Sequence, residues 1–220
     1  MTGTEILALF EDIIDDSWDE DSAFLLMDSA KVAVEEDRPW EFLKTEDSSK
    51  SRAVGDTFAS TKALPTNFGR DYKMYVGDSL IEYFPVPFEE RRRYRNLSRR
   101  YYIDMVNLVM GFCGVAASAE TIYLQYLKTT TTLTSANKAL TILTWPTRFH
   151  PYLAFKMAEI YFAGIDADDI TARMSPKHAQ TAKMMYSAMV RWDTALKLRA
   201  RGGSSNAGNV DISSLPDVVA

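Results

Sequence analysis

Thr121-Ile-Tyr-Leu-Gln-Tyr-Leu-Lys128 is the stretch that most clearly departs from a helical pattern in this chain of 220 residues. Its aliphatic and aromatic side chains alternate with polar ones, as is typical of a β-strand. Further upstream, two pairs of short apolar stretches flank turn residues, and each pair predicts a hairpin: residues 73–76 with 80–84, and residues 100–104 with 108–112. We therefore expect four or five antiparallel strands within residues 64–128.

The segments on both sides of this region have the periodicity of helices. Apolar side chains recur every three or four residues over 4–16 and 21–38, and again over 148–163 and up to Arg201. Residues 45–63 have weak periodicity and many small polar side chains, which indicates a mostly irregular connector with room for one strand or turn. The predicted fold class is therefore α+β and mainly α: a bundle of N- and C-terminal helices with a small inserted antiparallel β region.

We interpret residues 1–201 as a single domain with three parts, namely N-terminal helices (1–44), a β-rich insertion (64–128) and C-terminal helices (148–201). Residues 202–220 follow as a flexible Gly/Ser-rich arm, which can reach beyond its own domain. The arm ends in five apolar side chains: Val210, Ile212, Leu215, Val218 and Val219. Such a tip either frays, as chain ends usually do, or docks on a partner, for example by strand addition.

Charge is strongly segregated along the chain, although the net charge is only −5. Residues 1–38 contain twelve acidic and two basic residues, whereas residues 91–100 (RRRYRNLSRR) contain six arginines and no acid. Residues 170–201 contain seven basic residues and one acid. Opposite blocks in one chain favour either docking within the chain or head-to-tail contact between copies. Solvated helix faces of a monomer are the alternative.

The inventory of reactive side chains is small. Cys113 is the single cysteine, and His150 and His178 are the two histidines, so a disulfide framework or a histidine-rich metal centre is not expected. The chain has no phosphate-binding glycine loop and no dinucleotide fingerprint. We therefore expect no catalytic residue, no metal and no cofactor. A small enzyme with Cys113 as its nucleophile and His150 as its base is the alternative, but the apolar surroundings of Cys113 are typical of an inert thiol.

No membrane partner is expected. The longest apolar stretch, residues 105–119, is interrupted by Asn107 and two glycines. It is also shorter than the roughly 20 apolar residues that a membrane-spanning helix needs. The first residues lack the basic start and apolar run of a signal peptide, so we expect a soluble protein that is made and used inside a cell.

The run of arginines is the candidate interaction site. Guanidinium groups beside tyrosines can contact phosphate and stack on bases, or pair with the carboxylates of a protein. The sequence pI near 5.2 lacks the broad basic character of a nucleic-acid binder, so we favour protein contact. A nucleic-acid-binding regulatory module and a merely solvated loop are the alternatives. The residues of the candidate site are Arg91, Arg92, Arg93, Arg95, Arg99 and Arg100.

The order of elements resembles that of the head–tail connector (adaptor) proteins of tailed bacteriophages. The resemblance extends over about residues 4–200 and lies in short segments rather than in one motif. These segments are Pro39-Trp40-Glu-Phe-Leu43, Leu64-Pro65-Thr-Asn67-Phe68, Tyr101-Tyr-Ile-Asp104, Thr121-Ile-Tyr-Leu-Gln-Tyr126, Leu133-Thr134, and Pro146 with Phe149-His-Pro-Tyr-Leu153.

The resemblance implies a structural protein of the virion neck, between head and tail, that is made in the host bacterial cytoplasm. Its expected partners are further copies of itself in a ring, usually a dodecamer, the portal protein above, and a tail, stopper or nozzle protein below. Genome DNA passes through the ring only as cargo. The arm at residues 202–220 would grip the portal, and the six arginines would contact a neighbouring subunit or the next tail protein. A head-completion (stopper) protein or a tail terminator fits the same pattern.

Overall fold

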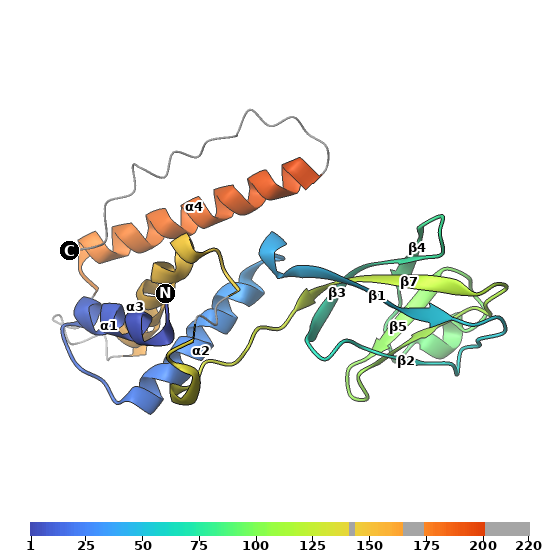
Figure 1. Ribbon diagram of the computed structural model, residues 1–220, viewed down its shortest axis with the longest axis horizontal. Helices are drawn as coiled ribbons and strands as arrows, with labels where there is room; N and C mark the ends of the chain where they lie inside the picture. The colour runs from blue at the N-terminus through green and yellow to red at the C-terminus, as the bar shows by residue number, and fades with distance from the viewer. Residues whose placement is uncertain (141–143, 165–173, 201–220) are drawn as a thin grey trace. The chain divides into compact units, whose positions relative to one another are not determined.

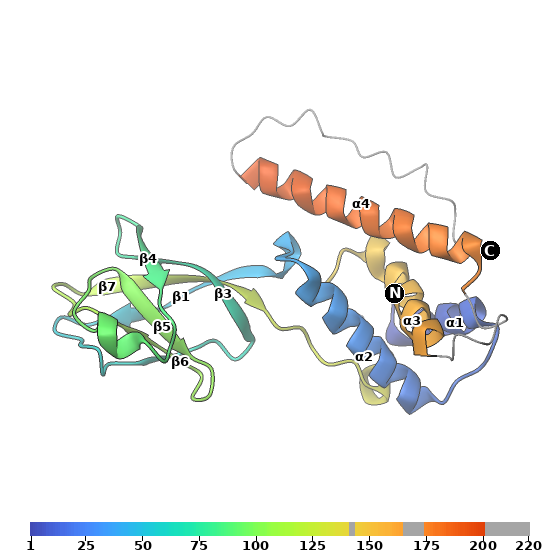
Figure 2. The same ribbon diagram turned by 180° about the vertical axis from the view of Figure 1, so that it is seen from behind.

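The computed structural model describes residues 1–140, 144–164 and 174–200, except for the side chains of Tyr72 and Ala200. The chain divides into two compact units (Figures 1 and 2). The helical unit combines residues 1–42 with the residues from 131 onward, and the β unit is the intervening Leu43–Thr130. Both ends of the sequence therefore contribute to one unit, and the other unit is inserted between them.

The helical unit contains four described α-helices: α1 (Gly3–Ile14), α2 (Glu20–Asp37), α3 (His150–Gly164) and α4 (Pro176–Ala200). Helices α1 and α2 begin at residues whose side chains accept hydrogen bonds from the otherwise free backbone N–H groups of the first turn. Thr2 and Glu5 form a reciprocal capping box at α1, and the Asp19 carboxylate accepts a hydrogen bond from the Ser22 N–H at α2. Short 3₁₀ turns at Ser135–Asn137 and Thr147–Phe149 connect the β unit to α3.

Helix α3 is the centre of the helical unit, because it packs against α1, α2 and α4. Its apolar side chains lie on several faces, as expected for a helix with neighbours all round. Among the described residues, none of the helices is both long enough and apolar enough to cross a membrane. The buried core includes Ile6 and Phe10 of α1, Phe24 and Met27 of α2, Leu153 and Met157 of α3, and Ala182 and Met189 of α4.

A buried carboxylate connects the end of α2 to α4. Asp193 of α4 has no solvent exposure, and its carboxylate accepts a hydrogen bond from the backbone N–H of Glu41. The same carboxylate lies 2.6 Å from the Lys197 ammonium and 3.4 Å from the Arg38 guanidinium. Next to it, the fully buried Trp40 donates its indole N–H to the Val34 carbonyl at 2.6 Å. The chain is therefore held firmly where it leaves the helical unit.

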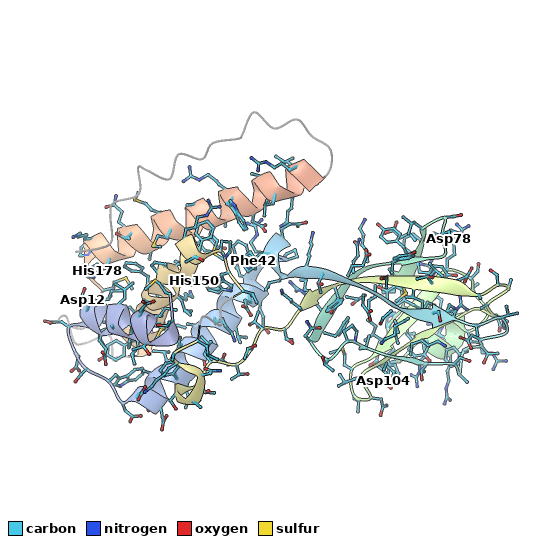
Figure 3. The ribbon with its side chains drawn as sticks, viewed as in Figure 1. Asp12, Phe42, Asp78, Asp104, His150 and His178 are labelled. Carbon is cyan, nitrogen blue, oxygen red and sulfur yellow. The ribbon has the colours of Figure 1, made fainter. Side chains whose placement is uncertain are left out.

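Replacing Asp193 tests this anchor. Asp193→Ala leaves Lys197 and Arg38 without their buried counter-charge, so we expect the free energy of unfolding of the helical unit to fall by about 3 kcal/mol or more. All four tryptophans lie in this unit, so tryptophan fluorescence during denaturant unfolding reports on it selectively. Asp12→Ala is the control, since Asp12 projects from α1 into solvent (Figure 3) and should change stability by less than about 0.5 kcal/mol. Equal effects of the two variants would contradict the anchor.

A buried histidine at the start of α3 gives the helical unit a pH dependence. His150 lies in the helical unit (Figure 3). Its Nε2 lies 2.8 Å from the Trp145 carbonyl oxygen, and its Nδ1 lies 3.0 Å from the Met1 amino group. Burial lowers the pKa of His150 below its ordinary value of 6.5, so the folded state favours the neutral ring. As pH falls below that value, the unfolded chain binds a proton that the folded chain does not, and stability is lost.

We therefore expect His150→Gln to weaken the pH dependence of unfolding. Between about pH 7 and about pH 5, the wild-type free energy of unfolding should fall further than that of the variant, because glutamine does not titrate. The measurement is denaturant unfolding followed by tryptophan fluorescence at both pH values. Carboxylates titrate equally in both proteins and cancel in the comparison. An equally steep loss in the variant would exclude His150 as the source.

The β unit contains a seven-stranded sheet among the described residues, in the order β1-β7-β3-β4-β5-β6-β2. All neighbouring strands are antiparallel except β4 and β5, and the sheet curls until it is nearly a barrel. The strands are β1 (Lys44–Arg52), β2 (Lys62–Ala63), β3 (Phe68–Val76), β4 (Ile81–Pro85), β5 (Arg100–Asp104), β6 (Val109–Phe112) and β7 (Glu120–Lys128).

The concave side of the sheet encloses an apolar core of its own. The largest contributions come from β3, β6 and β7, whose inward side chains are almost fully buried. The β unit therefore has two properties of an independent structural unit, strands that pair with one another and a separate core. The buried cluster comprises Leu64, Phe68, Met74, Val76, Tyr101, Met110, Phe112, Ile122, Leu124 and Tyr126.

The prediction of a mainly helical bundle with a small antiparallel insertion is wrong. The β residues form a unit of their own with a seven-stranded mixed sheet, not four or five antiparallel strands. Part of the error lies in residues 45–63: the sequence predicts a mostly irregular connector with room for one strand or turn, but the segment contains most of β1 and all of β2. β1 is an edge strand with polar side chains on both faces, so it lacks the alternation that identifies a half-buried strand. The hairpin prediction at Gly77-Asp78 is confirmed by the pairing of β3 with β4.

Candidate interaction site

The six candidate arginines all lie in the β unit, between the end of β4 and the start of β5. Arg91–Tyr94 form one 3₁₀ turn, and Arg100 begins β5 opposite Phe84 of β4. A short turn rather than a regular helix allows neighbouring arginines to point in different directions. The structure consequently separates the six into side chains that support the fold and side chains that do not.

Arg91 and Arg100 are part of the fold. The Arg91 guanidinium lies 3.5 Å from the centre of the Phe88 ring and donates a hydrogen bond to the Phe88 carbonyl. The Arg100 guanidinium lies over the Phe84 ring at 5.1 Å. Both side chains are half-buried, and their cation–π contacts hold the segment against the sheet. These two arginines are therefore less suited to bind a partner.

Arg92, Arg95 and Arg99 are the exposed members that remain available. Within the described part of the chain, their guanidinium groups have no hydrogen bond or ion pair. Arg93 is also exposed, but it lies 3.8 Å from Glu90 in a solvent-exposed pair that contributes little. The Arg99 backbone has a left-handed φ of 58°, and its carbonyl accepts the Phe84 N–H at 3.0 Å, so the sheet holds this residue in a strained conformation.

Three apolar side chains at the same end of the sheet add to the candidate site. Val54 is 69% exposed, Val115 is 69% exposed and Leu97 is 49% exposed. Single exposed apolar residues are ordinary, whereas several on adjoining loops mark an interaction surface. Sequence reasoning missed all three. Leu97 lies inside the arginine run and was visible as its one aliphatic residue, but nothing in the sequence connects Val54 with Val115.

Backbone contacts bring the three loops together. The Gly55 N–H donates to the Ala116 carbonyl at 2.9 Å, and the Ala116 N–H donates to the Asp56 carbonyl at 3.0 Å. Gly114 packs so closely against the Leu97–Ser98 backbone that a Cβ there would lie 3.3 Å from the Ser98 Cα. We use the name arginine–valine patch for the exposed side chains of these three loops, namely Val54, Arg92, Arg95, Leu97, Arg99 and Val115.

Arg52 is buried and stabilises the loop at Gly114, which is one of the loops of the patch. This arginine is 2% exposed, and it donates to the Gly114 carbonyl at 2.6 Å and to the Tyr83 hydroxyl at 3.2 Å. It also lies 3.6 Å from the Glu120 carboxylate and 4.5 Å from the centre of the Phe112 ring. A buried guanidinium with this many partners fixes the loop at Gly114, so the patch is presented by rigid backbone.

The alternative nucleophile has the environment of a core residue. Cys113 is fully buried beside Val86 and Tyr102, and burial raises the pKa of its thiol, against the weaker opposite effect of Arg100. The thiol is therefore protonated at neutral pH, which disfavours nucleophilic attack. His150, the base proposed for it, belongs to the helical unit. Among the described residues, no group of three His, Cys, Asp or Glu side chains could hold a metal ion.

The proposed arm residues Val210, Ile212, Leu215, Val218 and Val219 lie outside the described residues. Comparison of the chain with protein-family models found no match, and comparison with curated proteins found none either. The candidate site is therefore argued from its own geometry. That geometry, three available guanidinium groups beside exposed apolar side chains on rigid loops, is suited to binding an anionic partner surface.

The environment of Cys113 predicts slow alkylation. In the folded protein at neutral pH, iodoacetamide should modify Cys113 at least about tenfold more slowly than in the urea-unfolded chain, because the thiol is buried and protonated. Mass spectrometry of timed samples measures both rates. Labelling of the folded protein at or above the unfolded rate would revive Cys113 as a nucleophile.

Proposed function

We propose that the chain is a structural virion protein of a tailed phage, a head–tail connector (adaptor) that associates with copies of itself and links the portal to the tail. The observation that carries this proposal is the pairing of oppositely charged units in one chain. The helical unit has 12 basic and 20 acidic residues, net −8, and the β unit has 13 basic and 10 acidic residues, net +3. The arginine–valine patch adds an available cationic surface to the β unit.

Two surfaces of opposite charge on one chain favour assembly in a defined geometry. A head-to-tail contact uses two different surfaces of each copy, and repeating it generates a closed ring when the rotation between copies permits. A connector needs such a ring to surround the passing genome. The resemblance in element order to phage adaptors points to the same role, although it includes no catalytic residue.

The proposal includes further partners in the virion neck. The portal would bind the C-terminal arm at residues 202–220, and a tail, stopper or nozzle protein would lie on the other side of the ring. A stopper or tail terminator would share the neck location and differ in its neighbours. The nucleic-acid-binding alternative is favoured by one observation, the three arginines that have no partner among the described residues, and it predicts duplex binding that weakens steeply with salt.

Immunogold electron microscopy tests the proposed location. An antibody against the whole chain is applied to partly disrupted particles from cells that encode it. We expect gold at one vertex of the head or at the top of the tail, because a connector occupies a single site per particle. Particles without label, or cells that yield no particles, would overturn the proposal. In that case, titration with short DNA duplexes at several salt concentrations tests the nucleic-acid alternative.

A further inference from the structure

We infer that the arginine–valine patch binds the outer face of α2 in a second copy of this chain. The inference rests on the proposed function in one respect, namely that the chain works as an assembly of copies. It identifies both surfaces of the contact: a patch on the β unit of one copy and a helix face on the helical unit of the next. The argument depends on exposure, apolar character and charge at the two surfaces.

The outer face of α2 is unusual for a surface helix, because its exposed centre is apolar. Leu25 is 71% exposed and Val32 is 38% exposed, and the small residues Ser29 and Ala33 lie beside them. Positions 21, 25, 29, 32 and 36 follow one another at spacings of three and four, so they line one face of the helix. Helix α2 packs its opposite side on α3, and no described segment covers this outer face.

Both ends of this face are acidic. Asp21 and Glu36 are exposed, and neither carboxylate has a hydrogen bond or ion pair with the described residues. Asp37 beside them accepts a hydrogen bond from the Tyr186 hydroxyl and is already engaged. The face therefore consists of an apolar centre between two available carboxylates.

The patch has the complementary arrangement. Its apolar residues are Val54, Leu97 and Val115, and its charged groups are the guanidinium groups of Arg92, Arg95 and Arg99, which lie on the same loop as Leu97. Apolar side chains buried at the centre of such a contact supply most of the affinity, and the arginine–carboxylate pairs at its rim supply orientation and specificity. A second copy of this chain is thus a partner whose surface fits both features of the patch.

The two surfaces differ from each other, and they belong to different units of the chain. A contact between them is therefore heterologous. Each copy binds one neighbour through its patch and another neighbour through its α2 face. This geometry makes a distinctive prediction. A copy that lacks only the patch can still accept a neighbour on α2, and a copy that lacks only the α2 face can still offer its patch.

Two variants that change the charge of the proposed surfaces test the inference. The patch variant carries Arg92→Glu and Arg95→Glu, and the α2 variant carries Leu25→Lys and Glu36→Lys. The control, Lys177→Glu with Lys183→Glu, makes the same change of charge as the patch variant on the exposed side of α4. Circular-dichroism melts of all the proteins should coincide, since the altered side chains are exposed and have no side-chain hydrogen bond or ion pair with the described residues.

Sedimentation velocity over a range of concentrations gives the result. We expect the wild type and the control to associate, and each variant alone to associate at least about tenfold more weakly. An equimolar mixture of the two variants should form a one-to-one dimer and nothing larger, because one intact patch meets one intact α2 face. A monomeric wild type, undiminished association of either variant, or no dimer in the mixture would overturn the inference.

Other occupants of the two surfaces give different results. If the remainder of the same chain covers α2, the α2 variant loses thermal stability and the mixture forms no dimer. If the patch binds nucleic acid, the patch variant loses duplex binding while self-association is unchanged. Both outcomes contradict the inference. The proposed location fails separately: gold at the virion neck with a monomeric protein leaves the virion location in place and contradicts this contact, and self-association without gold contradicts only the virion role.

Discussion

The Asp193 carboxylate is the interaction on which the organisation of the chain depends. It holds the segment that follows α2 against α4, so residues from the two ends of the sequence meet in one helical unit. Burying a carboxylate away from solvent costs free energy unless cations and N–H groups surround it. The buried Asp193 therefore favours the one arrangement of the chain that provides these groups. Arg38, Lys197 and the Glu41 backbone satisfy that requirement together. Trp40, fully buried alongside, supplies the apolar part of the same anchor.

In the β unit a different buried charge, the Arg52 guanidinium, stabilises the surface loops. Arg52 fixes the loop at Gly114, and through that loop it positions the neighbouring loops that hold Leu97 and Val54. Loops held by a rigid interior lose little conformational entropy when a partner binds. The strained backbone of Arg99 points to the same conclusion, since strain persists only where the surrounding structure determines the conformation. The patch is thus built before any partner arrives.

Local patterns predicted individual elements well and the architecture poorly. The alternation at residues 121–128 matches β7 within one residue, and the apolar spacing over 4–16 matches α1 within two. The failures have a common cause, since they concern properties that arise only between segments. The edge strand β1 has no buried face, so its sequence lacks the alternation of apolar and polar residues. The parallel pairing of β4 with β5 is not indicated by any short stretch of sequence. The arginine run was visible, but the separation of structural from available arginines depends on rings elsewhere in the fold.

The connection between the two units has a consequence for how such a protein evolves. Lys44 pairs with Leu127, so the β unit begins and ends at adjacent strand positions. A unit with neighbouring ends can be exchanged for another of the same kind while the helical packing stays intact. The β unit can therefore be exchanged in evolution without a change in the helical unit. Proteins with the same helical unit can then differ in the exposed surface of the β unit.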